Sequence, residues 1–145
     1  METFTIEKKI VLNIPIEKVF SALTNSQEIP RYFPLKSVES TWNVGSEVLY
    51  KGELDGVPFT DFGVIEKLTS PTEYRYRYWS DNHGTQRTEQ NYLTISYNLE
   101  KSNEGTVLTV KQSNIKSPEM YELMNGQVWD YLLNSFKQYI EVSTQ

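Results

Sequence analysis

The sequence predicts an α+β domain: a curved antiparallel sheet of six or seven strands wrapped on a long C-terminal helix, with two short helices after strand one. Three observations predict this class. The 145-residue chain opens with one alternating segment, followed by helical spacing. Apolar residues then recur with a period of two from residue 38 to 112, and helical spacing returns from about residue 117. Helices segregated onto one face of an antiparallel sheet make such a domain.

The first strand is predicted over residues 4–12, where apolar side chains alternate with polar ones. Pro15 suits the first position of a helix, and apolar residues up to Leu23 follow at helical spacing. Asn25, with the acidic Glu28 three positions later, predicts the start of a second helix. Prolines soon after it keep this helix short.

Turn sequences divide the central region into strands. Asp55-Gly56 lies between two alternating runs, which is the strongest short-range signal for a hairpin. Further turn sequences lie at 70–72, 81–84 and 103–105. Consecutive hairpins of this kind predict an antiparallel meander.

The C-terminal helix is predicted from Ser117-Pro118-Glu119 to about Val142, because a hydroxyl cap, a proline and an acidic residue open it. Gly126 within it indicates close packing or a bend. The apolar arc is wide enough to face a broad apolar surface. It consists of two stripes: Trp129, Leu133, Phe136 and Ile140, and beside them Met124, Val128, Leu132 and Tyr139. A long helix cannot fill all the space beneath a strongly curved sheet, so an internal cavity is expected.

Charge and cysteine content exclude several function classes. The net charge is −5, with 19 acidic and 14 basic residues and no basic run, which argues against nucleic acid and against an anionic membrane surface. Cysteine is absent, so disulfides and thiolate catalysis are excluded, and one histidine leaves a zinc site short of ligands. No leader and no apolar run of about 18 residues is found. We therefore expect a cytoplasmic protein without membrane insertion, metal or cofactor.

Residues 15–25 (Pro-Ile-Glu-Lys-Val-Phe-Ser-Ala-Leu-Thr-Asn) resemble the "P-x-E-x-V-W-x-A-L-T-D" opening of START-related (SRPBCC) ligand-binding domains. More narrowly, the chain is similar to bacterial relatives of the activator of the ninety-kilodalton heat-shock protein's ATPase. Further matching segments follow in the family's order: 31–34, 44–46, 63–66, 70–71, 74–79, 105–110 and 129–140. The resemblance implies one helix-grip domain over residues 1–145 and the stress-response association of that family.

The resemblance does not fix the activity, because this superfamily is implied to include lipid carriers, plant hormone receptors, polyketide cyclases and co-chaperone domains. The sequence departs from the plant members in lacking their glycine-rich loop. It also replaces the usual aliphatic alternation with Arg-Tyr alternation over 74–78.

Tyrosines supply the main signal for binding. Tyr74, Tyr76 and Tyr78 alternate with two arginines, so the tyrosines share one face. That face is expected to point inward, since an unpaired buried guanidinium costs far more than a buried phenol. Tyr97 shares parity with Ile95. Hydroxyls inside the sheet need partners, which a ligand or trapped water could supply. A filled aromatic core is the alternative.

Amides and helix residues complete the candidate site. Gln112 and Asn91 continue inward parities and could orient a polar group at the cavity end, although strand-end solvation explains them equally. Trp129 and Leu133 face the sheet, either toward a ligand or in ordinary packing. The predicted ligand-binding residues are Tyr74, Tyr76, Tyr78, Asn91, Ile95, Tyr97, Gln112, Trp129 and Leu133.

No catalytic residue is predicted. His83, the single histidine, lies in a turn sequence and is interpreted as part of the turn. Asp61 lies between Phe59 and Gly63 on a strand, and a rim or solvent-facing position is favoured over a cavity contact. The other carboxylates, among them Asp55, Glu66 and Asp130, show no paired spacing for acid–base chemistry.

Three functions remain in order of preference. The first is binding of a small hydrophobic molecule, aromatic or lipid-like, as a carrier or sensor. The second is a co-chaperone-like module that binds a chaperone or another protein, with Tyr32, Trp42 or Trp79 as exposed anchors. The third is a cyclase- or hydrolase-like enzyme that uses Asp61, Gln112 and the tyrosines.

Overall fold

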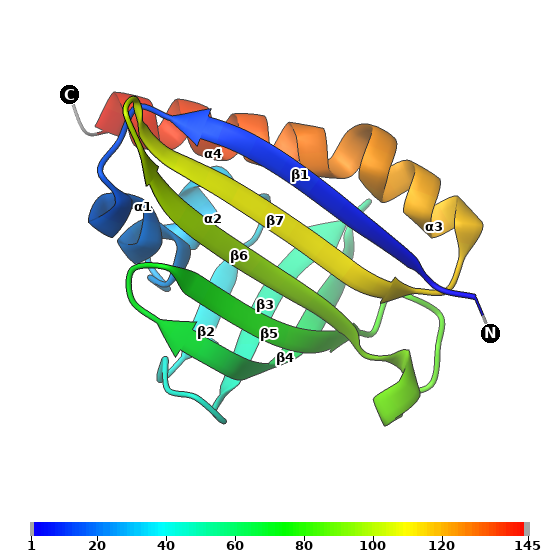
Figure 1. The fold of residues 1–145 in the computed structure, drawn as a ribbon. Coiled ribbons are helices and arrows are strands. Elements are labelled where there is room, and N and C mark those ends of the chain that lie inside the picture. Colours follow the sequence, from blue (N-terminus) through cyan, green and yellow to red (C-terminus); the bar gives the residue numbers. More distant parts are fainter. Residues whose placement is uncertain (1, 144–145) are drawn as a thin grey trace.

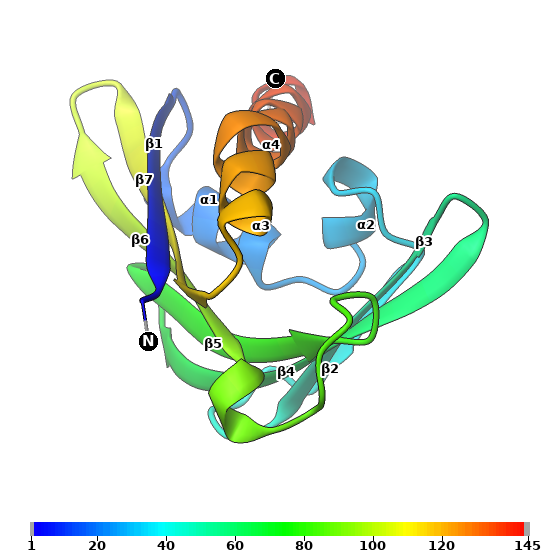
Figure 2. The same cartoon turned by 90° about the vertical axis from the view of Figure 1, so that its right-hand side faces the viewer.

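A seven-stranded antiparallel sheet curves around the C-terminal helical segment in the computed structural model, which describes residues 2–143 (Figures 1 and 2). The strand order is β1-β7-β6-β5-β4-β3-β2, so β2 to β7 form a continuous meander and β1 is added beside β7. All helices except the short η1 lie on the concave side of the sheet (Figure 2). This arrangement confirms the predicted α+β fold.

The strands begin and end close to the predicted turns. Their bounds are β1 Phe4–Leu12, β2 Ser37–Ser40, β3 Glu47–Leu54, β4 Val57–Thr69, β5 Glu73–Ser80, β6 Leu93–Ser102 and β7 Gly105–Ile115. The β3–β4 hairpin turns at Asp55 and Gly56, which both have positive φ (52° and 81°). A two-residue turn with two positive φ angles matches the twist of the strands that it joins.

The helices follow the predicted order. Their bounds are α1 Ile16–Leu23, α2 Ile29–Tyr32, the 3₁₀ turn η1 Glu89–Asn91, α3 Pro118–Leu123, the π-helical segment η2 Met124–Val128 and α4 Trp129–Ser143. Asn25 caps the turn that leads into α2, because its Oδ1 accepts from the backbone N–H groups of Gln27 and Glu28. Ser117 caps α3 through a hydrogen bond from the Met120 N–H, 3.1 Å long.

The predicted C-terminal helix is continuous but irregular. Gly126 lies within the π-helical segment η2. The space around it is open, since a Cβ added there would meet no atom within 4 Å apart from the backbone of its own helical turns. The prediction of close packing at Gly126 is therefore wrong, and the irregularity of the helix is the π-helical segment itself.

The inward parity of β5 is confirmed. Tyr74, Tyr76 and Tyr78 are buried, whereas Arg75 and Arg77 point to the outer face and pair there with Glu66. Arginines in contact with water and carboxylates keep their charge solvated, while the phenol rings fill the interior.

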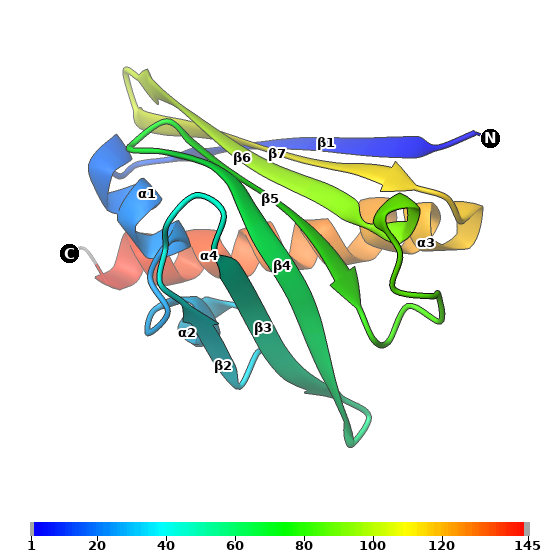
Figure 3. The same ribbon diagram turned by 90° about the horizontal axis from the view of Figure 1, so that it is seen from below.

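One stripe of α4 closes the core from the other side. Trp129, Leu133, Phe136 and Ile140 are all buried. Tyr32 of α2 packs on Phe136, and its hydroxyl donates to the Ala22 carbonyl over 2.8 Å. Tyr32 is only 4% exposed, so its predicted role as an exposed anchor is wrong. The reason is that α2 packs beside α4 rather than projecting from the domain (Figure 3).

None of the helices within residues 2–143 combines the length and the hydropathy needed to cross a bilayer.

Candidate ligand-binding site

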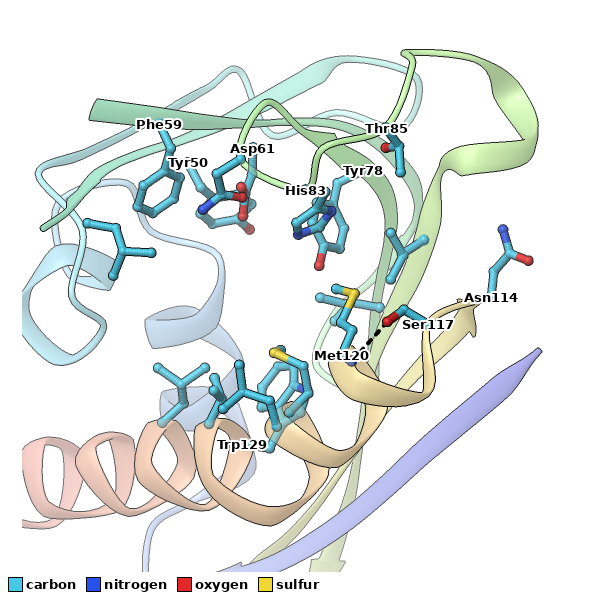
Figure 4. A pocket seen from close by; sticks show the side chains of 18 of the residues that line it. Tyr50, Phe59, Asp61, Tyr78, His83, Thr85, Asn114, Ser117, Met120 and Trp129 are labelled. Atoms are coloured by element: carbon cyan, nitrogen blue, oxygen red, sulfur yellow. Dashed lines mark hydrogen bonds between the residues drawn. The ribbon is translucent and has the colours of Figure 1, made fainter. Parts of the chain in front are cut away.

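A cavity of about 640 Å³ lies between the concave face of the sheet and the α3–η2–α4 segment (Figure 4). Small-molecule sites in proteins commonly measure about 300–1,000 Å³, so this volume accommodates a ligand of drug size. Tyrosine, phenylalanine and aliphatic side chains line its sheet side: Tyr50, Phe59, Tyr76, Tyr78, Leu93, Ile95 and Tyr97.

The helical side of the cavity is equally apolar. The side chains there come from all three parts of the C-terminal helical run: Met120, Leu123, Met124, Val128, Trp129 and Leu132. Leu123, together with Leu54 at the end of β3, is more than half exposed (51% and 59%). The lining therefore reaches the molecular surface, and a ligand has a route inward.

Six of the nine predicted site residues line this cavity. They are Tyr76, Tyr78, Asn91, Ile95, Tyr97 and Trp129. Tyr74, Gln112 and Leu133 do not line it, because each is buried behind the lining. Asn91 holds its own loop, since its Nδ2 donates to the Gln86 carbonyl over 2.9 Å. Contact of any of these residues with a ligand stays a prediction.

Gln112 connects three elements behind the lining. The Trp129 Nε1–H donates to Gln112 Oε1 over 2.8 Å, and Gln112 Nε2 donates to the Tyr78 hydroxyl oxygen over 3.0 Å. The amide thus joins β7 to both α4 and β5. Because Tyr78 accepts this bond, its own hydroxyl proton remains available.

Two buried tyrosines of the cavity wall have hydroxyls without a protein partner among residues 2–143. The Tyr50 and Tyr74 hydroxyls pair with each other at 2.7 Å, but no hydrogen bond is found for the hydroxyls of Tyr76 and Tyr97. Every fully buried side-chain nitrogen or oxygen in residues 2–143 has a partner, so these two hydroxyls are accessible from the cavity. Burial raises the pKa of both, so they remain protonated donors.

Asp61 supplies a carboxyl group to the same cavity. It lies in β4, paired in register with Tyr50 of β3 and Ser80 of β5. Desolvation raises the pKa of Asp61 from 3.8 to about 6, opposed by a hydrogen bond from Ser80 and reinforced by the charge of Asp81. Asp61 lines the cavity and is half-buried, so the expectation of a solvent-facing side chain is wrong. Its parity with the inward-facing Phe59 and Gly63 is the signal that could have placed it there.

His83 lines the cavity from the loop after β5. Its ring centroid lies 5.7 Å from that of Tyr78, in an edge-on arrangement. Burial lowers the pKa of His83, although the charge of Asp81 opposes this shift, so the ring is neutral near pH 7. The interpretation of His83 as part of a turn holds for its backbone but misses its inward side chain, which lies near Tyr78 (Figure 4).

Residues 2–143 offer no cluster of three or more carboxylate, histidine or cysteine side chains that could hold a metal ion. Glu66 pairs with Arg75 and Arg77, and Asp130 pairs with Lys8. What the arrangement offers chemically is a mainly apolar chamber with tyrosine hydroxyls, the carboxyl groups of Asp61 and Glu119, the His83 ring and the Lys116 ammonium group.

Comparison with known proteins points to one family. The model of the Activator of Hsp90 ATPase homolog 1-like protein family matches residues 13–141. A protein from Cytophaga hutchinsonii of known solution structure is 28% identical, with a TM-score of 0.84 and coverage of 99% of both chains. No curated protein matches the sequence.

More distant solved structures share the fold. The Aha1 dimer from Colwellia psychrerythraea is 19% identical over 98% of this chain and 99% of its own, with a TM-score of 0.77. CalU16 from Micromonospora echinospora is 18% identical over 98% of this chain and 78% of its own, with a TM-score of 0.69.

Proposed function

Given that the chain belongs to the family of Activator of Hsp90 ATPase homolog 1-like proteins, we propose that its cavity binds a small hydrophobic molecule, aromatic or lipid-like. The protein would act as a carrier or sensor of that molecule. The absence of cysteine from all 145 residues suits a reducing compartment such as the cytoplasm, where we place this activity.

The observation that carries this proposal is the cavity itself, with its apolar wall and the unpaired hydroxyls of Tyr76 and Tyr97. Protein interiors normally contain few voids larger than a water molecule. A filled aromatic core, the alternative explanation of the tyrosines, would leave no space of about 640 Å³. An apolar wall supplies affinity by removing the ligand's surface from water, and a few polar groups supply orientation.

Titration with the neutral fluorophore N-phenylnaphthylamine tests the proposal. We expect a saturable increase in fluorescence at one site per chain and a rise in Tm, because a ligand that binds only the folded state stabilises it. Absence of both changes would refute the proposal.

Two matched variants locate the binding. Val128→Trp places a large ring in the cavity wall, whereas Val142→Trp adds the same ring at a position of the same helical run that is 70% exposed. We expect the first variant to weaken probe binding at least about tenfold and the second to leave it unchanged. Equal effects of the two would place the probe elsewhere on the surface.

Family membership favours a second candidate function, a co-chaperone-like module. Of the predicted aromatic anchors, Trp42 and Trp79 are half-buried and donate their Nε1–H groups to Ser26 and Thr85. Exposed apolar side chains are found instead on the β3–β4 hairpin, at Leu54 and Val57. Stimulation of the ATPase of a purified Hsp90-type chaperone would support this candidate, particularly if N-phenylnaphthylamine fails to bind.

A further inference from the structure

Building on the proposed function, we infer the class of ligand: an apolar molecule whose one polar end donates a hydrogen bond to Asp61, such as an alcohol, a phenol or an amine. A carboxylic acid of the same size and shape is the ligand that this site disfavours.

The position of Asp61 carries the inference. Its carboxyl group lies in the cavity wall close to Tyr50, its register partner on β3 (Figure 4). On the other side, Asp61 is paired in register with Ser80 of β5. Asp61 is half-buried, so its carboxylate has lost part of its hydration and gains from further donors, because burying an unpaired charge is unfavourable.

The protein supplies few of those donors. No lysine or arginine within residues 2–143 forms an ion pair with Asp61. The Ser80 hydroxyl has a single proton, which serves either Asp61 or the Asn82 Oδ1, 2.7 Å away. An ionised carboxylate has about four acceptor positions, so most of those on Asp61 are open to a ligand.

The charged and titratable groups around Asp61 do not change this conclusion. Asp81, on the loop after β5, adds a second negative charge and disfavours ionisation of Asp61. His83 on the same loop is uncharged near pH 7, and the hydroxyls of Tyr76 and Tyr78 on β5 keep their protons. Lys116 is the lysine of the cavity lining, but it forms no ion pair with Asp61 and its ammonium group donates to the Gln90 carbonyl. A ligand carboxylate directed to Asp61 would therefore meet two negative charges and no cation paired with them.

The rest of the cavity sets a complementary requirement. The unpaired hydroxyls of Tyr76 and Tyr97 are donors, so they suit a carbonyl or ether oxygen on the body of the ligand. Donors along the wall and one acceptor at Asp61 together give the site a polarity, with the donating end of the ligand directed to β4.

Three naphthalene derivatives test the inference, each with one group at the same ring position: hydroxymethyl, aminomethyl or carboxyl. Their Kd values are measured by calorimetry at about pH 8, where Asp61, with a pKa of about 6, is ionised. A hydrogen bond to a charged group contributes enough for about tenfold in affinity or more, so we expect the alcohol and amine to bind at least that much more tightly than the acid.

Two variants assign the preference to Asp61. Asp61→Asn removes the charge with little change of shape, and we expect it to abolish the discrimination against the acid. Asp130→Asn makes the same change of net charge on the exposed side of α4, where Asp130 pairs with Lys8, and we expect it to keep the discrimination.

The outcomes separate this inference from the function on which it rests. If all three derivatives bind equally in the parent protein, or if Asp61→Asn leaves their ranking unchanged, the inference is overturned and the proposed function stands. Binding of N-phenylnaphthylamine without binding of any of the three derivatives would likewise overturn the inference and leave the proposed function standing. If neither that probe nor any derivative binds, both proposals fail.

Discussion

Two effects oppose each other at the Asp61 carboxyl group. The apolar cavity favours its uncharged form, whereas water at about pH 7 favours its ionised form. Desolvation is the larger effect and raises its pKa to about 6. Below this value the folded protein holds a proton on Asp61 that the unfolded chain releases near the ordinary value of 3.8. The native state is therefore favoured by protonation of this group, and this contribution is lost as the pH rises through about 6.

Asp61→Asn is predicted to stabilise the protein in a pH-dependent way. The variant has no proton to lose, so its free energy of unfolding should exceed that of the parent above about pH 6. A shift of about two pH units corresponds to a gain of at most about 3 kcal/mol. The gain should decline as the pH falls and vanish below about pH 4. Urea unfolding of both proteins over this range measures it.

Asp130→Asn is the control, because the exposed Asp130 carboxyl pairs with Lys8 outside the cavity. Its effect should stay small at every pH, since exposed ion pairs contribute about 0–1 kcal/mol. A difference between Asp61→Asn and the parent that did not vary with pH would contradict the assignment of the shifted group.

Gln112→Leu is predicted to destabilise the fold by about 2–4 kcal/mol, because it leaves the Trp129 Nε1–H without an acceptor in a buried position. The Tyr78 hydroxyl loses its donor at the same time. Trp129→Phe in the Gln112→Leu background should cost less than in the parent, since the bond is already broken. Strictly additive free energies of unfolding would show that the two side chains are not coupled.

Alternation along the chain was enough to predict the inward tyrosines of the site but not its carboxyl group. The inward position of Tyr74, Tyr76 and Tyr78 is predictable, because the opposite parity would bury the neighbouring arginines without partners. Asp61 has the inward parity of Phe59, but carboxylates usually face water, and that expectation prevailed. How far the α3–η2–α4 segment shields Asp61 from water follows only from the tertiary structure.

Among the elements, those with local signals were predicted and those that depend on packing were not. Asp55-Gly56 and Ser117 act through backbone geometry and one hydrogen bond, both encoded within a few residues. The 3₁₀ turn η1 and the π-helical segment η2 have no such signal. A π-helical segment inserts one residue into a helical turn, which lets the residues before and after it face different surroundings.

Two glycine substitutions are predicted to have opposite effects. Gly126→Ala should raise the free energy of unfolding by about 0.5–1 kcal/mol, because its surroundings are open and alanine favours helical backbone. Gly105→Ala should lower it by more than about 2 kcal/mol, since φ is +136° and the added Cβ would lie 2.4 Å from the Leu12 carbonyl oxygen. Thermal and urea unfolding compare the pair. Destabilisation by Gly126→Ala would mean that the π-helical segment requires glycine.

At the scale of the whole molecule, the packing is uneven around the cavity. The strands β6 and β7 are paired on both sides and contribute many buried side chains to the core. No residue of α3 or η2 is buried, although Met120 and Met124 line the cavity beneath them. A helical segment that covers a cavity instead of packing on a filled core gains little from burial, so its backbone hydrogen bonds should open more readily than those of α4.

Amide hydrogen exchange tests this difference in local stability. In the ligand-free protein, we expect the amides of α3 and η2 to exchange faster than those of α4 around Phe136, which is fully buried. Binding of N-phenylnaphthylamine raises the stability of the whole molecule, which slows the amides that exchange only on global unfolding. Amides that exchange by local opening slow only if the ligand contacts the segment that opens.

Slowing of exchange in α3 and η2 on addition of the probe would therefore place the ligand beneath this segment. The amides of α1 serve as the control, because α1 contributes no residue to the cavity wall. Protection limited to the globally exchanging amides would mean that the segment opens independently of the ligand. In that case the mobile part of the cavity wall would lie elsewhere, and the loop that carries His83 would be the next segment to follow.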